Sequence, residues 1–319
     1  MKVDSIFFVE SPLQFNNAVT LIKLKKLVPV IVVRLNGEID NDRQLSDLTL
    51  NFSGALKFIN IKKSDKLALF YSIIRLTLFF TSLKWRACRC FLGDWRSIWM
   101  KVVAYSISPS KVNVIDDGFA TLTVLNQLEK KITTKRSLFE CKCFRPTFYT
   151  YFPVESDVLN VINLRSKNSN SSMVKEITDT IMFIGAPLVE KQIINCADYL
   201  FYISKALSKY PENQFKNIEY IPHRAEHSDN YNQVAALDNR VSIKKLDQPI
   251  EDYIKKNREV PAVLLSFYST ALYNLSEYSE QSTAVAIYLP FNIISNKYRT
   301  QIENVYQFFE SKSKVSVLK

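Results

Sequence analysis

The stretch KVNVIDDGFATLTVLNQLEKK, residues 111–131, joins a short apolar segment to an amphipathic one through two aspartates and a glycine. Residues 111–118 have the apolar character of a buried strand, and 119–131 carry apolar residues at helical spacing. The same order, strand and then helix, recurs along the chain. Strands that alternate with helices predict parallel sheets built from βαβ units, so we expect an α/β fold.

Outward from this stretch, the alternation covers most of the chain. We expect strands at 5–10, 29–35, 56–61, 87–94, 111–118, 180–185, 216–224, 260–270 and 283–289, and helices at 12–26, 67–83, 95–107, 119–131, 189–207, 271–279 and 297–311. Between 133 and 175 the alternation is lost. We therefore predict two successive α/β domains, at 1–155 and 175–319, with a linker at 156–174.

The composition of the 319 residues excludes several classes of protein. A hydrophobic content of 47% predicts packed cores and not disorder. Only five glycines are present and neither GxGxxG nor GxxxxGK[ST] occurs, which argues against a glycine-rich phosphate loop. A net charge of +11 suggests an anionic partner, but the basic residues are scattered and form no nucleic-acid-binding module. We therefore expect no nucleic acid partner.

The cysteines and the chain start indicate a reducing cytoplasm, because five cysteines is an odd number and no signal-like segment opens the sequence. Cys88 and Cys90 in CRC, and Cys141 and Cys143 in CKC, fit neighbours on a strand face better than a four-thiolate metal site, which stays open as the alternative. No resident metal and no cofactor are expected.

The most apolar stretch, LALFYSIIRLTLFFTSL at 67–83, is 17 residues long and has Arg75 at its centre. It predicts a buried or interfacial helix and not a membrane span. Basic residues flank it at 62, 63, 66, 84 and 86, which keeps a peripheral contact with the inner membrane open. The oligomeric state is also open, and a homodimer is one option.

Every unusual polar cluster follows a predicted strand, where open α/β sheets bind their ligands. In chain order, the clusters are Ser11 and Gln14; Asp116 and Asp117; Gly185; His223, Arg224 and Glu226; and Ser266, Ser269 and Thr270. Both histidines of the chain, His223 and His227, lie in one window of five residues. Taken singly, each cluster also fits a turn, a helix cap or a satisfied buried side chain.

Taken together, these residue types fit an enzyme that transfers a chemical group from an activated anionic donor substrate. Arg224, Ser269 and Thr270 can bind phosphate oxygens. A protonated His223 can donate a hydrogen bond or a proton to a departing phosphate, and Glu226 can accept from a ribose diol. A carboxylate of the other domain can deprotonate the acceptor hydroxyl.

Five short motifs resemble those of the bacterial lipooligosaccharide and O-antigen sialyltransferases, spread in order across most of the chain. They are FFVESPLQ at 7–14, IDDG at 115–118, FIGAPLVE at 183–190, YIPHRAE at 220–226 and SFYSTAL at 266–272. The resemblance implies an inverting, metal-independent glycosyltransferase of the GT-B type, with two Rossmann-like domains that face each other across a cleft. It would move sialic acid or a related nonulosonate from a CMP-sugar to a bacterial surface glycan such as lipopolysaccharide, O-antigen or capsule, with a galactose-terminated acceptor.

The resemblance also implies roles for individual residues. His223 resembles the histidine at the donor phosphate, Ser269 and Thr270 the hydroxyls at the phosphate or the sugar carboxylate, and Glu226 a ligand of the nucleotide ribose. Asp117 or Asp116 resembles the base, and Glu190 is a second candidate. We place Gly185, Arg224 and Ser266 on the donor side, and Ser11 and Gln14 on the acceptor side. The related enzymes often have His before Pro, whereas Pro222 precedes His223 here.

Two other classes of function stay open. HRAEH at 223–227 fits the H-x-x-E-H pattern of zinc metalloproteases, although the strand-like NIEYIP precedes it where a helix is needed. The other class is a non-catalytic α/β protein that binds an anionic ligand. DND at 40–42 resembles a metal-binding D-x-D, but it lies in the polar segment 36–44, where we expect a loop with a solvated turn.

Overall fold

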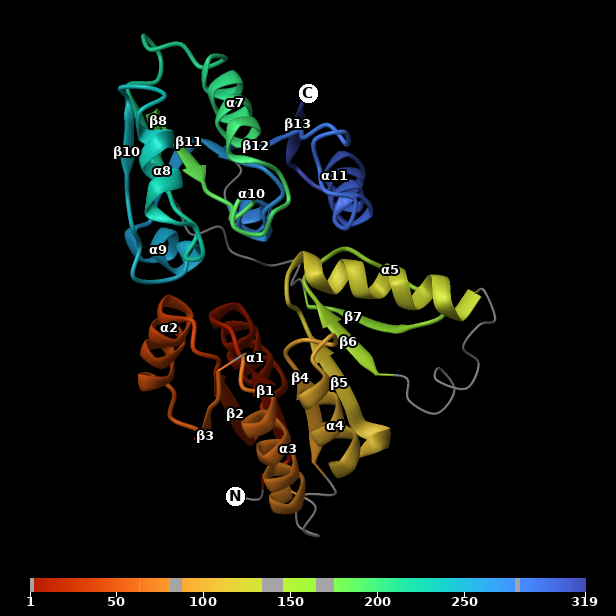
Figure 1. Ribbon diagram of the computed structural model, residues 1–319. Helices are drawn as coiled ribbons and strands as arrows, with labels where there is room; N and C mark the ends of the chain where they lie inside the picture. Colours follow the sequence, from red (N-terminus) through yellow and green to blue (C-terminus); the bar gives the residue numbers. More distant parts are fainter. Residues whose placement is uncertain (1–2, 63, 81–87, 134–145, 165–174, 279–281) are drawn as a thin grey trace. The chain divides into compact units, whose positions relative to one another are not determined.

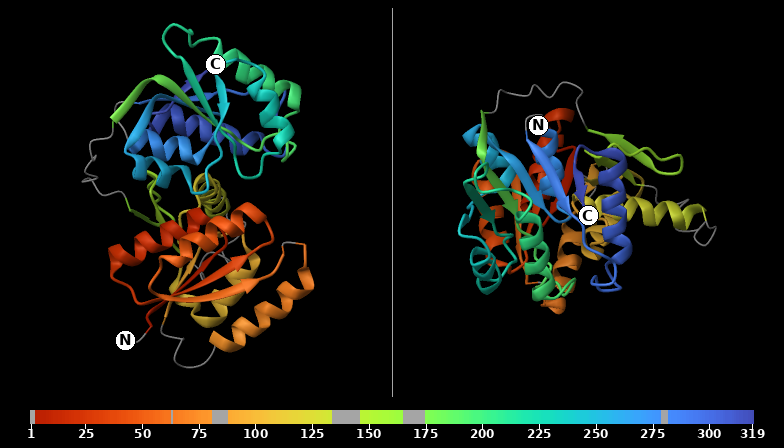
Figure 2. Two further views of the ribbon diagram at one scale, coloured as in Figure 1. Left: turned by 90° about the vertical axis from the view of Figure 1, so that its left-hand side faces the viewer. Right: turned by 90° about the horizontal axis from the view of Figure 1, so that it is seen from above.

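The computed structural model describes residues 3–62, 64–80, 88–133, 146–164, 175–278 and 282–319. The chain divides into two compact units, Met1–Asn168 and Ser169–Lys319. Each unit contains one sheet whose strand pairs are all parallel, and helices pack on both faces of each sheet (Figures 1 and 2). The expected fold class, two Rossmann-like α/β domains, is confirmed.

The sheet of the first unit has the strand order β3-β2-β1-β4-β5-β6-β7. Its strands are β1 (Ser5–Val9), β2 (Pro29–Leu35), β3 (Ala55–Asn60), β4 (Arg89–Leu92), β5 (Val112–Ile115), β6 (Thr147–Thr150) and β7 (Asn160–Asn163). Its helices are α1 (Pro12–Lys25), α2 (Ile39–Leu50), α3 (Lys66–Phe80), α4 (Ile98–Ile107) and α5 (Phe119–Thr133), and a 3₁₀ turn covers Pro109–Lys111. The order reverses between β1 and β4, which is where such sheets bind ligands.

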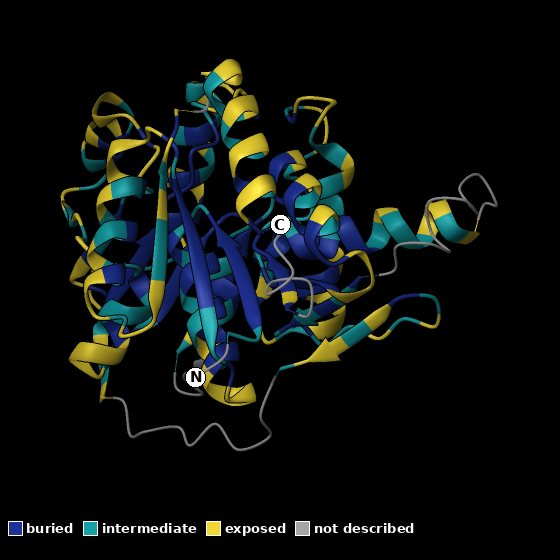
Figure 3. Ribbon diagram, turned by 90° about the horizontal axis from the view of Figure 1, so that it is seen from below, coloured by how far each residue is buried: buried dark blue, intermediate teal, exposed yellow. Residues whose placement is uncertain are grey.

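Strand β1 is buried on both sides, and its alternate residues serve the two faces of the sheet. Ile6 and Phe8 pack in one core with α3 and α4, whereas Phe7 and Val9 pack in another with α1 and α2. Phe7 also stacks on Phe91 of β4, with ring centroids 4.4 Å apart. Burial on both faces explains why the strand is a continuous apolar run in the sequence. Figure 3 shows the central strands as buried and the outer helix faces as exposed.

The sheet of the second unit has the order β10-β9-β8-β11-β12-β13, which repeats the winding of the first six strands of the other sheet. Its strands are β8 (Lys175–Ile184), β9 (Asn217–Ile221), β10 (Val241–Ile243), β11 (Glu259–Ser266), β12 (Thr283–Ile287) and β13 (Ser316–Leu318). Its helices are α7 (Cys196–Leu207), α8 (Ser228–Ala235), α9 (Ile250–Asn257), α10 (Thr270–Tyr278) and α11 (Arg299–Lys312). Here the order reverses between β8 and β11.

Three segments differ from the sequence-based expectation. The expected linker 156–174 contains β7, which pairs with β6 at the edge of the first sheet and is mostly exposed, so its apolar pattern is weak. The expected helix at 189–207 begins only at Cys196, because a turn covers the preceding residues and Gln192 has a φ of +55°. The expected loop at 36–44 is the start of α2.

The beginning of α2 also corrects the expected solvated turn at 40–42. The carboxylate of Asp42 accepts the backbone N–H groups of Asn36 (3.0 Å) and Gly37 (2.8 Å). Asn41 is buried and donates from Nδ2 to the carbonyl of Glu10 (3.1 Å). The DND residues therefore stabilise the first turn of a helix, where acidic side chains also complement the helix dipole.

Among the described residues, none of the helices has the length and apolar character needed to cross a membrane. The most apolar helix, α3, has 15 described residues.

Candidate functional site

In the first unit, Gln14 connects the ends of β1, β4 and β5. Its Nε2 donates to Oδ1 of Asp117 (3.0 Å), and its Oε1 accepts the backbone N–H of Glu10 (2.9 Å). A Cβ atom on Gly93 would lie 2.8 Å from the amide carbon of Gln14 and 2.8 Å from the carbonyl oxygen of Phe8. Only glycine fits there, so Gly93 directly follows β4 and lets the chain pass close to Gln14.

Arg96 bridges two carboxylates at this edge of the sheet. Its guanidinium donates to both oxygens of Asp94, with Nε 2.9 Å from Oδ1, and its Nη2 lies 3.2 Å from Oδ2 of Asp117. Burial raises the pKa of Asp117 from 3.8 to about 7, and the negative charge of Asp94 adds to this effect. The amide of Gln14 and the charge of Arg96 act in the opposite direction. A carboxyl group whose pKa lies near neutrality suits a general base.

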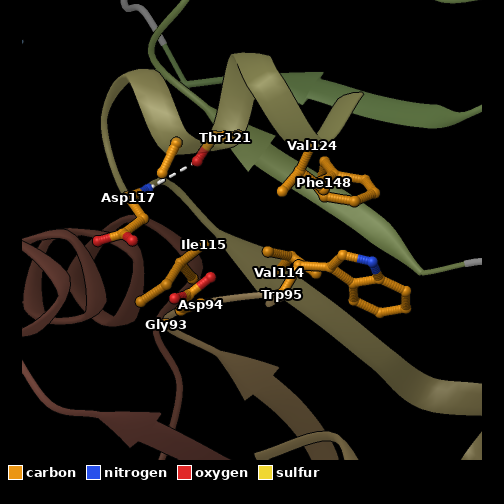
Figure 4. Close-up of a pocket in the computed structure, with 10 residues that line it drawn as sticks. Gly93, Asp94, Trp95, Val114, Ile115, Asp117, Thr121, Val124 and Phe148 are labelled. Carbon is orange, nitrogen blue, oxygen red and sulfur yellow. Dashed lines mark hydrogen bonds between the residues drawn. The ribbon is translucent and has the colours of Figure 1, made fainter. Parts of the chain in front are cut away.

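Asp94 and Asp117 line a small pocket at the ends of β4 and β5 (Figure 4). The floor is apolar and includes Val114, Val124 and Phe148. The pocket is small, with a cavity volume of about 10 Å³, which is room for about one water molecule. The carboxylate of Asp117 is partly accessible, because its side chain keeps 16% exposure.

Asp116, the other member of the predicted pair, is 2% exposed. Its Oδ2 accepts from Oγ1 of Thr150 (2.6 Å) and from the backbone N–H of Tyr151 (2.9 Å), and its Oδ1 accepts the N–H of Gly118 (2.7 Å). Burial raises its pKa to about 6, and these hydrogen bonds lower it. Asp116 thus ties β5 to the end of β6, and of the two aspartates only Asp117 lines the pocket.

Ser11, expected on the acceptor side, is the N-cap of α1, and its Oγ accepts the N–H of Gln14 (3.3 Å). Next to it, Oε2 of Glu10 accepts from Nη1 of Arg34 (3.1 Å) and from Nε1 of Trp99 (3.2 Å). Arg34 is buried, so this ion pair fixes the end of β1 in the interior. The structure gives Ser11 a capping role, and its acceptor role stays a prediction.

In the second unit, a buried network surrounds Glu226. Its Oε1 accepts from the hydroxyls of Tyr199 (2.9 Å) and Tyr220 (2.6 Å), and its Oε2 accepts the backbone N–H of His223 (2.5 Å). Burial raises the pKa of Glu226, and the hydrogen bonds from Tyr220, His223 and Tyr199 lower it. Both oxygens of Glu226 therefore hold the loop after β9 in place.

Gly185 makes room for this network. A Cβ atom at this position would overlap the carboxylate of Glu226 and would lie 2.7 Å from the hydroxyl of Tyr220. The N–H of Gly185 donates to the carbonyl of Ile221 (2.9 Å), which joins the ends of β8 and β9. The predicted importance of Gly185 thus has a packing cause in the structure, and its contact with a donor stays a prediction.

His223 is half-buried at the end of β9, and its Nδ1 accepts the backbone N–H of Ala225 (3.0 Å). A nitrogen that accepts a hydrogen bond carries no proton, so the neutral ring has its proton on Nε2. Burial lowers the pKa of His223 to about 3, and the positive charges of Arg224 and Lys191 lower it further. We expected a protonated His223. In the free protein it is instead a neutral ring that can donate one hydrogen bond from Nε2.

The zinc-protease pattern is not supported by the geometry. The pattern requires both histidines on one helix, but residues 223–227 form the turn between β9 and α8, and α8 begins only at Ser228. Glu226 points into the tyrosine network and not toward a shared ligand position. No group of three or more metal-ligating side chains occurs in the described part of the chain.

Glu190, the second candidate base, lies in the turn after β8. Its Oε1 accepts the backbone N–H of His227 (2.8 Å) and Nδ2 of Asn230 (2.7 Å). Because His227 is the N-cap of α8, Glu190 fixes the start of that helix. It lies in the same unit as His223, whereas Asp116 and Asp117 belong to the other unit.

The three hydroxyl residues after β11 do not share one environment. Ser266 is fully buried, and its Oγ donates to the carbonyl of Ile184 (2.8 Å), so it joins β11 to β8 and cannot meet a donor in this conformation. This corrects the expected donor contact of Ser266. Ser269 and Thr270 are half-buried at the start of α10, and Arg224 is exposed.

Three of the five cysteines lie within the described residues. Cys88, directly before β4, and Cys90, on β4, are both buried in the same core of the first unit. Cys141 and Cys143 lie outside the described residues, so the four-thiolate alternative stays untested.

Sequence reasoning missed Asp94, Arg96, Tyr199 and Tyr220. The predicted strand 87–94 ends in Gly93 and Asp94, so the strand-end rule would have found Asp94 had it been applied to every strand. Arg96 follows two residues later. Tyr199 and Tyr220 read as ordinary apolar positions of a helix and a strand, and nothing in their spacing indicates that their hydroxyls meet at Glu226.

Comparison with known proteins supports the fold. No protein-family model matches the sequence, and no curated protein matches it. Solved structures do match over nearly the whole chain. A glycosyltransferase from Rickettsia africae ESF-5 has 10% identity and a TM-score of 0.54, over 97% of this chain and 89% of that one. The UDP-N-acetylglucosamine 2-epimerase from Rickettsia bellii has 11% identity and a TM-score of 0.55, over 98% and 90%.

A third similar structure is the UDP-GlcNAc 2-epimerase from Neisseria meningitidis bound to UDP-GlcNAc, with 13% identity and a TM-score of 0.54 over 98% of this chain and 92% of that one. At such low identity the likeness concerns the fold alone. The chain has two parallel-sheet Rossmann-like domains and matches structures of the GT-B type.

Proposed function

We propose that this chain is an inverting, metal-independent glycosyltransferase. It would move sialic acid or a related nonulosonate from a CMP-sugar to a hydroxyl of a bacterial surface glycan, in lipopolysaccharide, O-antigen or capsule. Support comes from the fold and from the five sialyltransferase-like motifs, whose histidine and aspartate lie at the carboxyl ends of parallel strands. The observation that carries the proposal is the neutral His223, whose hydrogen bond from Ala225 leaves the proton on Nε2.

In the proposed reaction, the carboxylate of Asp117 accepts the proton of the acceptor hydroxyl. The hydroxyl oxygen attacks the anomeric carbon of the donor from the face opposite to the leaving group. The bond from this carbon to the phosphate oxygen breaks, and CMP leaves with the electron pair. Nε2–H of His223 donates a hydrogen bond to the phosphate oxygen on which the negative charge develops.

The free-protein pKa of His223 limits its role. A neutral imidazole donates a hydrogen bond but has no proton to spare at neutral pH, because burial and two neighbouring cations lower its pKa. A bound phosphate brings negative charge, which favours the protonated form. His223 therefore acts in the proposal first as a hydrogen-bond donor, and as a proton donor only once CMP carries charge.

The other predicted residues take supporting roles in the proposal. Ser269 and Thr270 at the start of α10 and Arg224 supply donors to the phosphate and to the sugar carboxylate. Glu226 acts through His223, because its carboxylate already accepts the His223 N–H and two tyrosine hydroxyls. Asp117 is preferred as the base because it lines a pocket, whereas Glu190 caps α8.

The histidines provide a matched pair for a test. We expect His223→Ala to lower the rate of CMP release in the presence of acceptor by roughly a hundred- to a thousandfold, the range for loss of one hydrogen-bond donor to a developing negative charge. His227→Ala should keep normal turnover, because His227 holds Glu190 through its backbone N–H, which the substitution leaves in place. The assay uses a panel of CMP-activated nonulosonates with lactose- or galactose-terminated acceptors.

If both variants lost the same fraction of activity and EDTA inactivated the protein, the proposal would be contradicted. A zinc metalloprotease would then be favoured. Tight CMP binding without turnover of any donor would instead indicate a non-catalytic binder.

The fold also fits a sugar-nucleotide epimerase, because two of the similar structures are UDP-GlcNAc 2-epimerases. Conversion of UDP-GlcNAc without an acceptor, and no use of CMP-sugars, would establish that candidate in place of the transferase.

A further inference from the structure

Helix α3 exposes an apolar stripe along its outer side. Five large apolar residues recur at helical spacing there, and Ile98 of the neighbouring α4 is also exposed. The exposed fractions are 73% for Leu67, 57% for Phe70, 69% for Tyr71, 41% for Ile74, 69% for Leu78 and 71% for Ile98. We call these six residues the α3–α4 face, and α3 and α4 lie side by side in Figure 1.

The opposite side of α3 already serves the core of the first unit. Leu76 is 4% exposed and Phe80 is fully buried, and both pack with α4 and the sheet. The helix therefore carries large apolar residues on its outer side as well as on its inner side, which is typical of helices in contact with a membrane or a partner. Monomeric soluble proteins rarely leave a contiguous patch of this kind in water. The α3–α4 face thus requires an occupant.

The charges around the face indicate what that occupant is. Lys57, Lys62, Lys66, Arg75 and Lys101 lie on or next to these elements. Within the described parts of 55–80 and 98–107, the one acidic residue is Asp65, and its Oδ1 accepts the N–H of Ala68 at the start of α3 (2.9 Å). Lys57 extends toward the helix, with Nζ 3.6 Å from the ring centroid of Phe79.

We propose that the α3–α4 face docks on the surface of a lipid bilayer rich in anionic headgroups. Apolar and aromatic side chains enter the headgroup region, and the surrounding lysines and Arg75 bind lipid phosphates. Because Leu76 and Phe80 of α3 pack in the core of the first unit, only the outer side of the helix can enter the lipid, so α3 lies in the plane of the surface. A second copy fits poorly, because it would present the same cations against this face.

Vesicle binding tests the proposal without reference to catalysis. We expect the full chain to co-sediment with vesicles of phosphatidylcholine and phosphatidylglycerol at least about tenfold more strongly than with phosphatidylcholine alone. Added salt should weaken this preference, because it screens the interaction between the cations and the headgroups.

Two variant pairs separate the apolar and the electrostatic contributions. Phe70→Ser combined with Leu78→Ser should lower vesicle partitioning at least about tenfold, since two side chains no longer enter the lipid. Phe201→Ser is the matched control, because Phe201 on α7 is 59% exposed in the other unit. Lys66→Glu combined with Arg75→Glu should lower partitioning by a similar factor, and Lys255→Glu combined with Lys256→Glu on α9 should not.

All substituted side chains are exposed, so circular dichroism should show an unchanged fold. Equal affinity for the two vesicle types, with no loss in either α3 variant, would overturn the proposal. So would a dimer, measured by light scattering, that dissociates in Phe70→Ser with Leu78→Ser, because the face would then be a self-association surface. Neither result depends on whether the chain transfers a sugar.

Discussion

The protonation of Asp117 depends on the groups that face it from three elements. Asp94 lies at the end of β4, Arg96 follows it, Asp116 precedes Asp117 at the end of β5, and Gln14 comes from α1. The two aspartates favour the protonated carboxyl group, and Arg96 and Gln14 favour the carboxylate. A single substitution nearby can therefore either raise or lower the pKa of Asp117.

We expect Asp94→Asn to lower the pKa of Asp117 and Arg96→Gln to raise it, each by about one pH unit. If Asp117 is the base, kcat/KM should rise through this pKa as the pH increases. The acidic limb of the profile would then move to lower pH in the first variant and to higher pH in the second. The carboxyl carbon shift of Asp117, followed by NMR, measures the same pKa without an assay.

Arg89→Gln is the matched control, since Arg89 also pairs with an aspartate of the first unit, Asp4, at 3.6 Å. It should leave the profile unchanged. Movement of the limb in the same direction for Asp94→Asn and Arg96→Gln would show that charge at this site does not set the pKa. If the acidic limb of the kcat/KM profile moves only in the variant Glu190→Gln, the base is Glu190 and not Asp117.

At this scale the sequence predicted positions better than roles. Gln14, Asp117 and His223 were selected because they follow predicted strands, and in the structure they do lie near strand ends. The hydrogen bond from Gln14 to Asp117, however, joins residues 103 positions apart. Ser266 and Ser269 look alike in SFYSTAL, yet one is fully buried and the other half-buried, because β11 ends between them. The neutral state of His223 depends partly on Lys191, which local sequence does not place beside it.

At the scale of elements, the cap of α7 decides where that helix begins. Oδ1 of Asn195 accepts the N–H of Asp198 (2.8 Å), and its Nδ2 donates to the carboxylate of Asp198 (2.7 Å). We expect Asn195→Ala to lower the free energy of unfolding by about 1 kcal/mol, the usual cost of losing such a cap. Urea unfolding followed by circular dichroism measures this change.

Ser97→Ala provides the comparison, because Ser97 is the N-cap of α4 but makes no capping hydrogen bond through its side chain. Its effect should stay below about 0.5 kcal/mol. If the two substitutions cost the same, the hydrogen bonds of Asn195 do not stabilise the helix start, and the late beginning of α7 would need another cause.

Elements with long apolar patterns were predictable, and short or polar ones were not. Strand β2 occupies the predicted residues because both of its faces are buried. Helices α8 and α9 have eight residues each and strands β10 and β13 three each, too few for a period to emerge. Helix α2 exposes Ile39 and Leu50, so its apolar residues do not mark its buried side, and Asn41 and Asp42 fix its start instead.

At the scale of the whole molecule, the two units repeat one winding order but differ in their titrating groups. The first unit holds Asp116 and Asp117, whose pKa values are raised mainly by burial. The second holds His223, whose pKa is lowered mainly by burial. The units can also be observed separately, because all three tryptophans of the chain, Trp85, Trp95 and Trp99, belong to the first.

These shifts predict opposite responses of stability to pH. A carboxyl group with a raised pKa stabilises its unit fully below its unfolded value of 3.8, and this stability is lost as the pH rises toward about 7. A histidine with a lowered pKa contributes stability above its unfolded value of 6.5, which is lost as the pH falls toward about 3. Lowering the pH should therefore stabilise the first unit through Asp117 and destabilise the second unit through His223.

Urea unfolding followed by tryptophan fluorescence tests the first half of this statement. Relative to Asp117→Asn, the wild-type chain should lose on the order of 3 kcal/mol between about pH 4 and pH 8, because its native state must give up a proton that the unfolded chain has already released. His223→Gln should leave this difference unchanged, since that residue lies in the unit without tryptophan. A difference between wild type and Asp117→Asn that does not vary with pH would mean that Asp117 keeps an ordinary pKa, and the group would then be poorly suited to act as a base near neutrality.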